Sequence, residues 1–363
     1  MSADEESGGS LRRLVSPDRV DGMLETCSAY AWPLLAVGTL IGAALPVLGL
    51  QSGFYMTFVT DLFLFAILAL SWDLVGGQTG YPSFGNMAFF GIGAYTTAVL
   101  VKDFAVGFPL AFLVAGLLAV AFATVIGVIV FRLRGHYFAI ATLGVLLAAQ
   151  QVSRNLEITG GSSGKILLET PSAEAFYYIF LGVLVVEMAL VYYLSGTRFG
   201  FVLNAIRDDE AKATAMGFNT TYYKTAAWML AALFTGLAGA AWSLDNTFVD
   251  PQTAYNSAWN VELIAMALLG GSGTVAGPVI GAFGLHSVIV VVDTFATGWQ
   301  LVLLGGAVIV TVISFPDGVV GTLSEYADEM EYYERGGMAA AGGDQEDPET
   351  SPDDGPAPGG GSG

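Results

Sequence analysis

The sequence predicts an all-α integral membrane protein, a polytopic helical bundle of 8–10 spans in which glycine and proline break some of the helices. The first observation is composition: of 363 residues, 54% are hydrophobic and only 12% are charged, against roughly 25% charged in an ordinary soluble domain. The second is length, because several apolar runs reach the roughly 20 residues that a helix needs to cross a bilayer. The third is that glycine-rich stretches interrupt these runs.

The apolar runs, taken in order, give the expected elements. The candidate spans are 29–49, 54–74, 84–101, 108–131, 136–153, 175–195, 225–244, 259–271, 276–293 and 299–315. The first run is expected to be retained as a membrane helix, because acids precede it where a secretory signal carries positive charge. The runs at 84–101, 259–271 and 276–293 are short and adjoin glycine-rich breaks, which predicts half-helices or re-entrant segments.

Charge divides the chain into an acidic N-terminal segment (1–28), a membrane domain (29–321) and an acidic disordered tail (322–363). The formal charge of −19 belongs largely to the two ends. The tail has almost no apolar residue, so it cannot offset the entropy of ordering. Acidic ends suit a protein in concentrated salt, or they are simply solvated. They argue against nucleic acid as a partner, because phosphates attract Lys and Arg.

The distribution of Lys and Arg predicts the orientation, because these residues favour the cytoplasmic side in short loops. With ten crossings and a cytoplasmic N-terminus, ten of the thirteen basic residues lie inside, while Lys102, Arg154 and Lys165 lie outside. This topology places both termini and the polar interval Arg198–Lys224 in the cytoplasm. We therefore expect a multi-pass protein of the cell membrane.

Residues for metal or catalytic chemistry are scarce. One cysteine, Cys27, allows no internal disulfide and no multi-cysteine metal site, and two histidines cannot build a histidine-rich one. The stretch GGSSGK at 160–165 approaches a phosphate loop but has Thr159 where a glycine is needed and Ile166 where Ser or Thr is needed. We expect no metal, no cofactor and no enzymatic activity in this chain.

Two glycine-rich breaks, Gly76–Tyr95 and Leu268–Gly284, stand where continuous helices would run. Irregular backbone at membrane depth is tolerated only if it is buried in protein or lines a wet cavity, and paired breaks point to a transport pathway. Two alternatives stay open: the glycines at 273, 277 and 281 have the spacing of close helix packing, and the polar side chains could satisfy backbone groups freed by the breaks. The residues predicted to line the pathway are Gln78, Ser83, Asn86, Thr142, Gly270, Gly271 and Thr274.

Acidic residues also occur inside apolar runs, Asp61 in the second span and Glu187 in GVLVVEMALVYY. A charge at a helix centre costs about 2.5–3.5 kcal/mol on insertion scales, so such residues usually face the bundle interior. A proton-coupled carrier would need acids of this kind, but no basic residue lies in mid-span to form a relay. We expect Glu187 to be neutral and hydrogen-bonded at a contact between helices.

The polar interval Arg198–Lys224 is the longest between two apolar runs. Asp208 and Lys212 have the i, i+4 spacing of a stabilising pair, and Gly217 suits a helix stop because glycine accepts a left-handed conformation. The interval therefore predicts a short surface helix from Arg207 to Met216, unless it is a solvated connector. The residues expected to fit a partner's groove are Ala211, Ala213 and Ala215, with Asp208, Asp209 and Glu210 at the rim.

Three stretches, GGQTGYPSFGNMAFFGIGAYTTAVL, AIRDDEAKATAMGFNTTYYK and LLGGSGTVAGPVIGA, resemble the LivM-type permease subunits of branched-chain amino acid ABC importers. YFAIATL at 137–143 and ITGGSSG at 158–164 match the same pattern, and the resemblance runs from about residue 50 to 321. It implies a heterodimer with a second permease, two cytoplasmic ATP-binding subunits and an extracellular substrate-binding protein. ATP binding would close the ATPase dimer and drive alternating access of the membrane bundle.

The resemblance also implies that the polar interval carries a coupling helix that docks on an ATPase. The predicted coupling residues are Arg207, Asp208, Asp209, Glu210, Ala211, Ala213 and Gly217, of which the last four resemble an EAA-like pattern with looser spacing. Asn86 stands where family members often have a histidine, which leaves a histidine-specific role without its residue. A urea or short-amide permease shares these motifs. An ion-coupled secondary transporter that uses Asp61 or Glu187 is the alternative from another class.

Overall fold

The computed structural model describes residues 53–167 and 171–295, together with 302, 305 and 306. All of them belong to the first of the two units into which the chain divides, Met1–Val320. The predicted span 29–49, nearly all of the predicted span 299–315 and both acidic ends lie outside the described residues.

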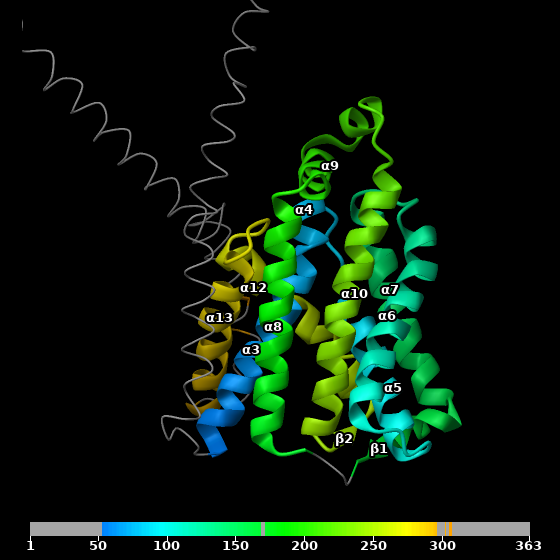
Figure 1. Cartoon of the computed structure of the whole chain (residues 1–363), viewed down its shortest axis with the longest axis vertical. Helices are drawn as coiled ribbons and strands as arrows, with labels where there is room; N and C mark the ends of the chain where they lie inside the picture. Colours follow the sequence, from blue (N-terminus) through cyan, green and yellow to red (C-terminus); the bar gives the residue numbers. More distant parts are fainter. Residues whose placement is uncertain (1–52, 168–170, 296–301, 303–304, 307–363) are drawn as a thin grey trace, which may run out of the picture. The chain divides into compact units, whose positions relative to one another are not determined.

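The described part is helical almost throughout (Figure 1). Its longer helices are α3 (Gly53–Asp73), α5 (Asn86–Lys102), α6 (Phe108–Val130), α7 (His136–Asn155), α8 (Ala173–Ser195), α9 (Arg198–Ala215), α10 (Thr220–Asp245), α12 (Ser257–Gly270) and α13 (Gly277–Phe295). The short elements are α4 (Gly76–Thr79), η1 (Glu157–Thr159), η2 (Gly161–Ser163), α11 (Pro251–Ala254) and the strands β1 (Lys165–Ile166) and β2 (Phe248–Val249). Every predicted span that falls within these residues coincides with a helix, so the all-α polytopic fold is confirmed.

Helix α10 packs against α3, α5, α6 and α8. Glycine permits the closest of these contacts: a Cβ on Gly93 of α5 would collide with the carbonyl of Gly236, and one on Gly239 would collide with the carbonyl of Phe90. Backbones of membrane helices approach this closely because small residues remove the side chains between them. The α5–α10 pair is therefore packed backbone against backbone.

Burial differs sharply among the helices. Every residue of α3 from Leu62 to Asp73 is buried, whereas only 33% of the apolar stretch of α6 and 39% of that of α8 are buried. Such apolar faces match a bilayer, because contiguous apolar surface is costly in water. The stretches of the described chain that are long and apolar enough to cross a membrane are Gly53–Thr79, Phe108–Val130, Ala173–Ser195 and Thr220–Asp245.

The three spans predicted to be short adjoin irregular backbone, as expected. α5 follows α4 and a turn at 80–85, and residues 271–276 separate α12 from α13. Positive φ angles at Gly80 (72°), Gly271 (117°) and Gly273 (84°) reverse the chain here, in a conformation that residues with a Cβ rarely adopt. Both breaks lie at the end of the bundle where α9 is found, since α4 and Gly273 contact α9.

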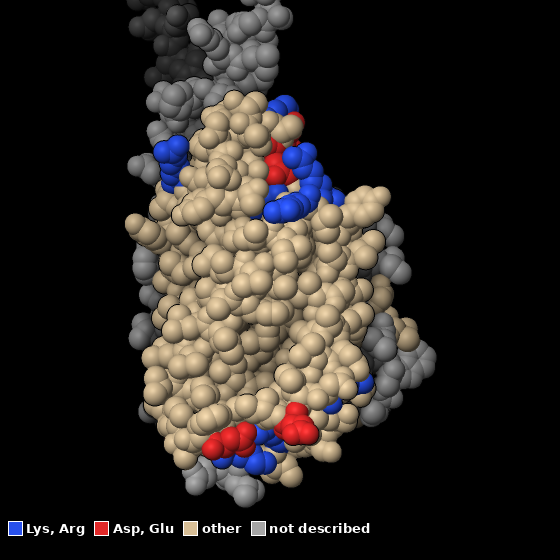
Figure 2. Space-filling view, turned by 90° about the vertical axis from the view of Figure 1, so that its right-hand side faces the viewer, with Lys and Arg blue, Asp and Glu red and all other residues tan. Residues whose placement is uncertain are grey.

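Charged side chains gather at the two ends of the bundle, and a broad uncharged belt separates them on the face shown in Figure 2. One end, the top of Figure 1, carries α9; the opposite end carries β1 and β2, which pair antiparallel. At that second end, Lys165 forms an ion pair with Asp103. The described basic residues of the α9 end are Arg132, Arg134, Arg198, Arg207, Lys212 and Lys224, and those of the opposite end are Lys102, Arg154 and Lys165.

Candidate functional site

Helix α9 is broken at Asp209, whose backbone is extended (φ −163°, ψ 104°). The predicted single helix from Arg207 to Met216 is therefore wrong, because residues 198–208 and 210–215 form two segments. Oδ1 of Asp209 accepts hydrogen bonds from the N–H groups of Ala211 (2.9 Å) and Lys212 (3.1 Å). Aspartate is a preferred N-cap because its side chain satisfies amides that have no partner within the helix. Asp209 thus caps the second segment, whose first residue is Glu210.

The second segment ends as predicted but is paired differently. Gly217 has a φ of 87°, the left-handed conformation expected of a helix stop. Lys212 forms its ion pair with Asp209 (Nζ–Oδ2 3.4 Å) and not with Asp208, because the N-cap position brings the Asp209 carboxylate over the first turn. The backbone hydrogen bonds from Lys212 and Ala211, with this ion pair, hold the pKa of the exposed Asp209 carboxyl below its usual value.

Glu210 lies at the centre of a polar network, here called the Glu210 network, that consists of Tyr81, Arg134, Glu210, Thr220 and Lys224. Its carboxylate accepts hydrogen bonds from Oγ1 of Thr220 (2.9 Å), from Nζ of Lys224 (2.6 Å) and from the hydroxyl of Tyr81. Nε of Arg134 lies 4.0 Å from the same carboxylate, and only 15% of the Glu210 side chain is exposed. The prediction that Glu210 lies at the rim of a docking face is therefore wrong.

Lys224 is the most deeply buried ion of this network, with 1% of its side chain exposed. Its ammonium stands over the rings of Tyr81 (4.1 Å to the centroid) and Phe131 (5.5 Å), contacts that stabilise a desolvated cation. Burial raises the pKa of Glu210, but hydrogen bonds from Lys224, Tyr81 and Thr220 outweigh it and hold that pKa below its usual value. Lys224 belongs to the first turns of α10 and not to a polar loop.

Arg207 lies between the two glycine-rich breaks. Its Cα is 3.6 Å from the place that a Cβ on Gly80 would take, and a Cβ on Gly273 would collide with its Nη1. The carboxylate of Asp73, the last residue of α3, accepts the N–H of Gly273 at 2.8 and 3.1 Å. A Cβ on Gly77 would lie 2.7 Å from that same nitrogen. Helix α9 therefore touches both breaks where the breaks meet each other.

The predicted docking face divides between the interior and the solvent. Ala213 is 1% exposed and packs inward, whereas Ala211, Ala215 and Asp208 are exposed. The groove-filling face of three alanines is therefore wrong for Ala213, because the chain turns at Asp209. Coupling to an ATPase through these residues stays a prediction.

Two polar residues predicted to line a pathway are bonded to nearby backbone. Oγ1 of Thr142 accepts the N–H of Phe84 (3.0 Å) and donates to the carbonyl of Ala139 (2.9 Å). Oγ of Ser83 accepts the N–H of Gly85 (3.1 Å). These bonds satisfy backbone groups of the irregular turn before α5, which is the second of the two interpretations that the sequence left open.

Three more predicted pathway residues lie at the end of α12 and in the turn that follows it: Gly270, Gly271 and Thr274. Oγ1 of Thr274 donates to the carbonyl of Gly271 (2.8 Å) and accepts the N–H of Gly277 (3.0 Å). A Cβ on Gly270 or on Gly281 would collide with backbone of the facing helix. The expectation of close packing through Gly277 and Gly281 is therefore confirmed, and Gly273 packs against α9 instead.

Gln78 and Asn86 complete the predicted set. Gln78 is 5% exposed on α4, and Asn86 is 1% exposed at the first position of α5. Neither amide atom of Asn86 has a hydrogen-bond partner in the part of the chain that the structure describes. The assignment of all seven residues to a translocation pathway stays a prediction.

Glu187 is fully buried where α8 packs against α3, and Oγ of Ser71 donates a hydrogen bond (2.6 Å) to its Oε1. The prediction of a hydrogen-bonded Glu187 at a contact between helices is confirmed. Its protonation state stays a prediction.

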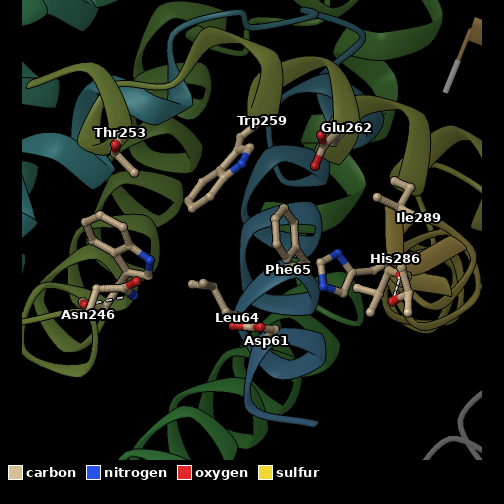
Figure 3. A pocket seen from close by; sticks show the side chains of 12 residues that line it. Asp61, Leu64, Phe65, Asn246, Thr253, Trp259, Glu262, His286 and Ile289 are labelled. Carbon is tan, nitrogen blue, oxygen red and sulfur yellow. Dashed lines mark hydrogen bonds between the residues drawn. The ribbon is translucent and has the colours of Figure 1, made fainter. Parts of the chain in front are cut away.

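A cavity of about 450 Å³ lies between α3, α10, α12 and α13 (Figure 3). Asn246 and Thr253 in its wall flank β2, which lies at the end of the bundle away from α9. None of the seven predicted pathway residues lines it. The sequence had drawn attention to Asp61 as an acid inside a span but not to Glu262, which the same signal identifies. Its wall includes Asp61, Phe65, Trp242, Trp259, Glu262 and His286.

Comparison with known proteins agrees with this architecture. Residues 54–312 match the family described as "Branched-chain amino acid transport system / permease component". The chain is 27% identical over 289 residues to the high-affinity branched-chain amino acid transport system permease protein LivM of Escherichia coli (strain K12), covering 71% of this chain and 68% of that protein. The protein of the same name from Salmonella typhimurium is 27% identical over 293 residues, with 72% and 68% covered.

An archaeal relative extends the comparison. The probable branched-chain amino acid transport permease protein LivM of Methanocaldococcus jannaschii is 24% identical over 277 residues, covering 64% of this chain and 79% of that protein. No solved structure matches the chain. The family match runs from the second residue of α3 past the end of α13 and takes in more than half of the sequence. The chain therefore belongs to the family of permease components of branched-chain amino acid transport systems.

Proposed function

We propose that this protein is the membrane-spanning permease subunit of an ABC-type importer for branched-chain amino acids. It forms half of the translocation pathway together with a second permease. Two cytoplasmic ATP-binding subunits supply the energy, and an extracellular binding protein delivers the substrate. Membership of the permease family supports this assignment, as do relatives named for high-affinity transport of these amino acids.

The observation that carries the proposal is the contact of α9 with both glycine-rich breaks. Arg207 packs against Gly80 of the first break and Gly273 of the second, and Asp73 bonds the second break to the end of α3. A displacement of α9 cannot leave these breaks unchanged, because closely packed backbone transmits strain. An ATPase that moves α9 would therefore move the irregular backbone of both halves.

The Glu210 network supplies a second connection from α9 to the bundle. Glu210 begins the second segment of α9, Tyr81 lies in the turn before α5, and Lys224 lies in α10. These are charge-assisted hydrogen bonds, which are shorter and stronger than neutral ones. The second segment is thus bonded both to the turn before α5 and to α10. These two helices, α5 and α10, are the pair packed backbone against backbone.

The charge distribution supports a cytoplasmic α9. Six described basic residues lie at the α9 end of the bundle and three at the opposite end. Lys and Arg are enriched on the cytoplasmic side of membrane proteins. We place α9 in the cytoplasm, within reach of an ATP-binding subunit, and the cavity between α3, α10, α12 and α13 toward the extracellular side.

The substitution Ala211→Arg tests the docking of α9. Ala211 is exposed, so the bulky charge leaves the fold intact and blocks the surface offered to an ATPase. In proteoliposomes that hold the complete importer, we expect ATP-driven leucine uptake to fall about tenfold or more, equivalent to at least 1.4 kcal/mol. Thr221→Arg is the matched control, because Thr221 is exposed at the same end but belongs to α10.

Unchanged uptake by Ala211→Arg would remove this surface of α9 from the coupling mechanism. Leucine uptake that an ion gradient drives without any ATP-binding subunit would show that the protein is a secondary transporter and not a subunit of an ABC importer. Uptake of urea or short amides in preference to leucine would keep the assignment as an ABC importer but change its substrate.

A further inference from the structure

The cavity between α3, α10, α12 and α13 has an acidic wall. Asp61 contributes one carboxylate from α3 and Glu262 another from α12, and none of the described residues around the cavity is Lys or Arg. Carboxylates inside membrane helices are costly unless something in the protein or a ligand compensates them.

Several other acids of the described bundle have partners of a kind that Asp61 and Glu262 lack. Ion pairs in the described part of the chain involve Asp103, Asp209 and Glu210, but not Asp61 or Glu262. Glu187 accepts a hydrogen bond from a serine, and Asp73 accepts one from a backbone N–H. Within the described residues, therefore, no ion pair balances the charge of Asp61 or Glu262.

His286 gives an independent sign of a ligand. It is only 7% exposed, it lines the cavity, and neither of its ring nitrogens has a hydrogen-bond partner among the described residues. Its ring stacks on Phe65 with 4.2 Å between centroids, and Figure 3 shows the two rings side by side within the cavity wall. Buried polar groups are nearly always hydrogen-bonded, so both ring nitrogens of His286 are free to bond a polar group of a ligand.

The remaining wall is aromatic. The rings of Phe65 and Trp259 meet edge to face at 5.3 Å, and those of Trp242 and Trp259 at 6.0 Å. Aromatic faces accept aliphatic side chains and attract ammonium groups. Sites for small molecules combine such apolar walls with a few placed polar groups, and a volume of about 450 Å³ is within their usual range of roughly 300–1,000 Å³.

We infer that this cavity binds an aliphatic amino acid by its ammonium group, with Asp61 and Glu262 as counter-ions and Trp242, Trp259 and Phe65 around the side chain. His286 supplies the hydrogen-bond donor for the carboxylate of the amino acid. The inference rests on the proposed function and deepens it, because it makes the permease itself select for an ammonium group. Urea and short amides have no such group and would gain nothing from the two carboxylates.

Protection of a cysteine in the cavity tests the inference. Cys27 is the only cysteine of the chain, so Val290→Cys in a Cys27→Ser background places one thiol in the cavity wall. The full chain in lipid nanodiscs is labelled with a maleimide in the presence of leucine, 3-methylbutylamine or 4-methylpentanoate. We expect leucine and the amine to slow labelling, and the acid, which lacks the ammonium, to leave the rate unchanged.

Charge-removing variants then assign the counter-ions. In the same background, Asp61→Asn and Glu262→Gln should each raise the leucine concentration for half-maximal protection about tenfold or more, as loss of a charge-assisted contact requires. Glu187→Gln is the matched control: it also neutralises a carboxylate within the helices, but Glu187 bonds to Ser71 outside the cavity, so protection should stay unchanged.

The outcomes separate this inference from the proposed function. Equal protection by 4-methylpentanoate or by sodium ions, or no protection by any probe while the complete importer still takes up leucine, would overturn the ammonium site alone. Failure of the complete importer to transport leucine, with protection by leucine intact, would overturn the proposed function and leave the site. If the carboxylate variants do not fold, the three probes on Val290→Cys still decide.

Discussion

Lys224 and Glu210 form an ion pair that is almost wholly removed from solvent, with 1% and 15% of their side chains exposed. Removing one member of such a pair leaves an uncompensated buried charge and typically costs about 3–5 kcal/mol, whereas replacing both is often nearly neutral. The neighbours are unequal, because Glu210 keeps Tyr81 and Thr220 as hydrogen-bond donors when Lys224 is lost. Lys224 would keep only the faces of aromatic rings.

We therefore expect Glu210→Gln to lower the thermal unfolding temperature of the full chain more than Lys224→Met does. The double variant Glu210→Gln/Lys224→Met should recover most of the loss, because it removes both charges. Thermal unfolding in detergent, followed by tryptophan fluorescence, measures all three variants. Losses that simply add in the double variant would show that the two residues do not stabilise each other.

The same pair predicts a dependence on pH. The pKa of Glu210 in the folded protein lies below the usual glutamate value of 4.5, so its contribution to stability is complete above 4.5 and is lost as the pH falls through the folded-state value. Thermal unfolding of the natural chain and of the Glu210→Gln variant should therefore converge on acidification, because protonation removes the same charge from Glu210. A stability difference that stays constant from neutral pH to well below 4.5 would contradict the depressed pKa.

The division of α9 into two segments depends on one side chain. Oδ1 of Asp209 caps the second segment through two backbone N–H groups, and no described side chain takes this role beside it. Asp209→Ala should raise the rate of hydrogen–deuterium exchange in residues 210–216, because the cap is lost. Asp209→Asn keeps a side-chain oxygen acceptor and is the matched control. Equal exchange in both variants would show that packing of Ala213, and not the cap, holds the segment.

Helix positions were predictable where the apolar pattern decides them. The runs at 54–74, 108–131 and 175–195 differ by only one or two residues from α3, α6 and α8, because burial in lipid or in the bundle needs about 20 apolar residues. The break in α9 was not predictable, because the charges of Asp208, Asp209 and Glu210 suit a helix N-terminus as well as a rim. Only tertiary contacts decide which of the three becomes the cap.

The candidate site could be predicted from the sequence only in part, because tertiary contacts bring its residues together. Glycine-rich stretches predicted the two breaks, but not that Asp73 would join them across the fold. Lys224 was read as a loop cation, because a buried lysine depends on a partner that no local pattern reveals. Glu262 was missed although it satisfies the same criterion as Asp61. Its place in one cavity wall with Asp61 and His286 arises from the packing of α3 against α12 and α13.

The meeting of the two breaks makes the bundle sensitive to a single methyl group. A Cβ on Gly77 would collide with the Asp73 carboxylate and crowd Gly273, so Gly77→Ala should lower the unfolding temperature by several degrees and reduce uptake by the complete importer, since overpacking typically costs about 1–3 kcal/mol. Gly182→Ala in α8 is the matched control, because nothing lies within 4 Å of its Cβ. If Gly77→Ala changes neither the unfolding temperature nor uptake, close contact between the two breaks is not required for stability or transport.

The ion pair of Glu210 with Lys224 and the hydrogen bond of Gly273 to Asp73 also differ in when they can first form during synthesis of the chain. Glu210 and Lys224 are 14 residues apart, whereas 200 residues separate Asp73 from Gly273. A nascent chain can therefore form the first contact as soon as the start of α10 has left the ribosome. The second has to wait until α12 is in the membrane, and until then the Asp73 carboxylate lacks the N–H that completes it. The contact that joins the two breaks is thus among the last to be made during biosynthesis. In an incomplete chain, α9 is already bonded to α10, but Asp73 is not yet bonded to the second break.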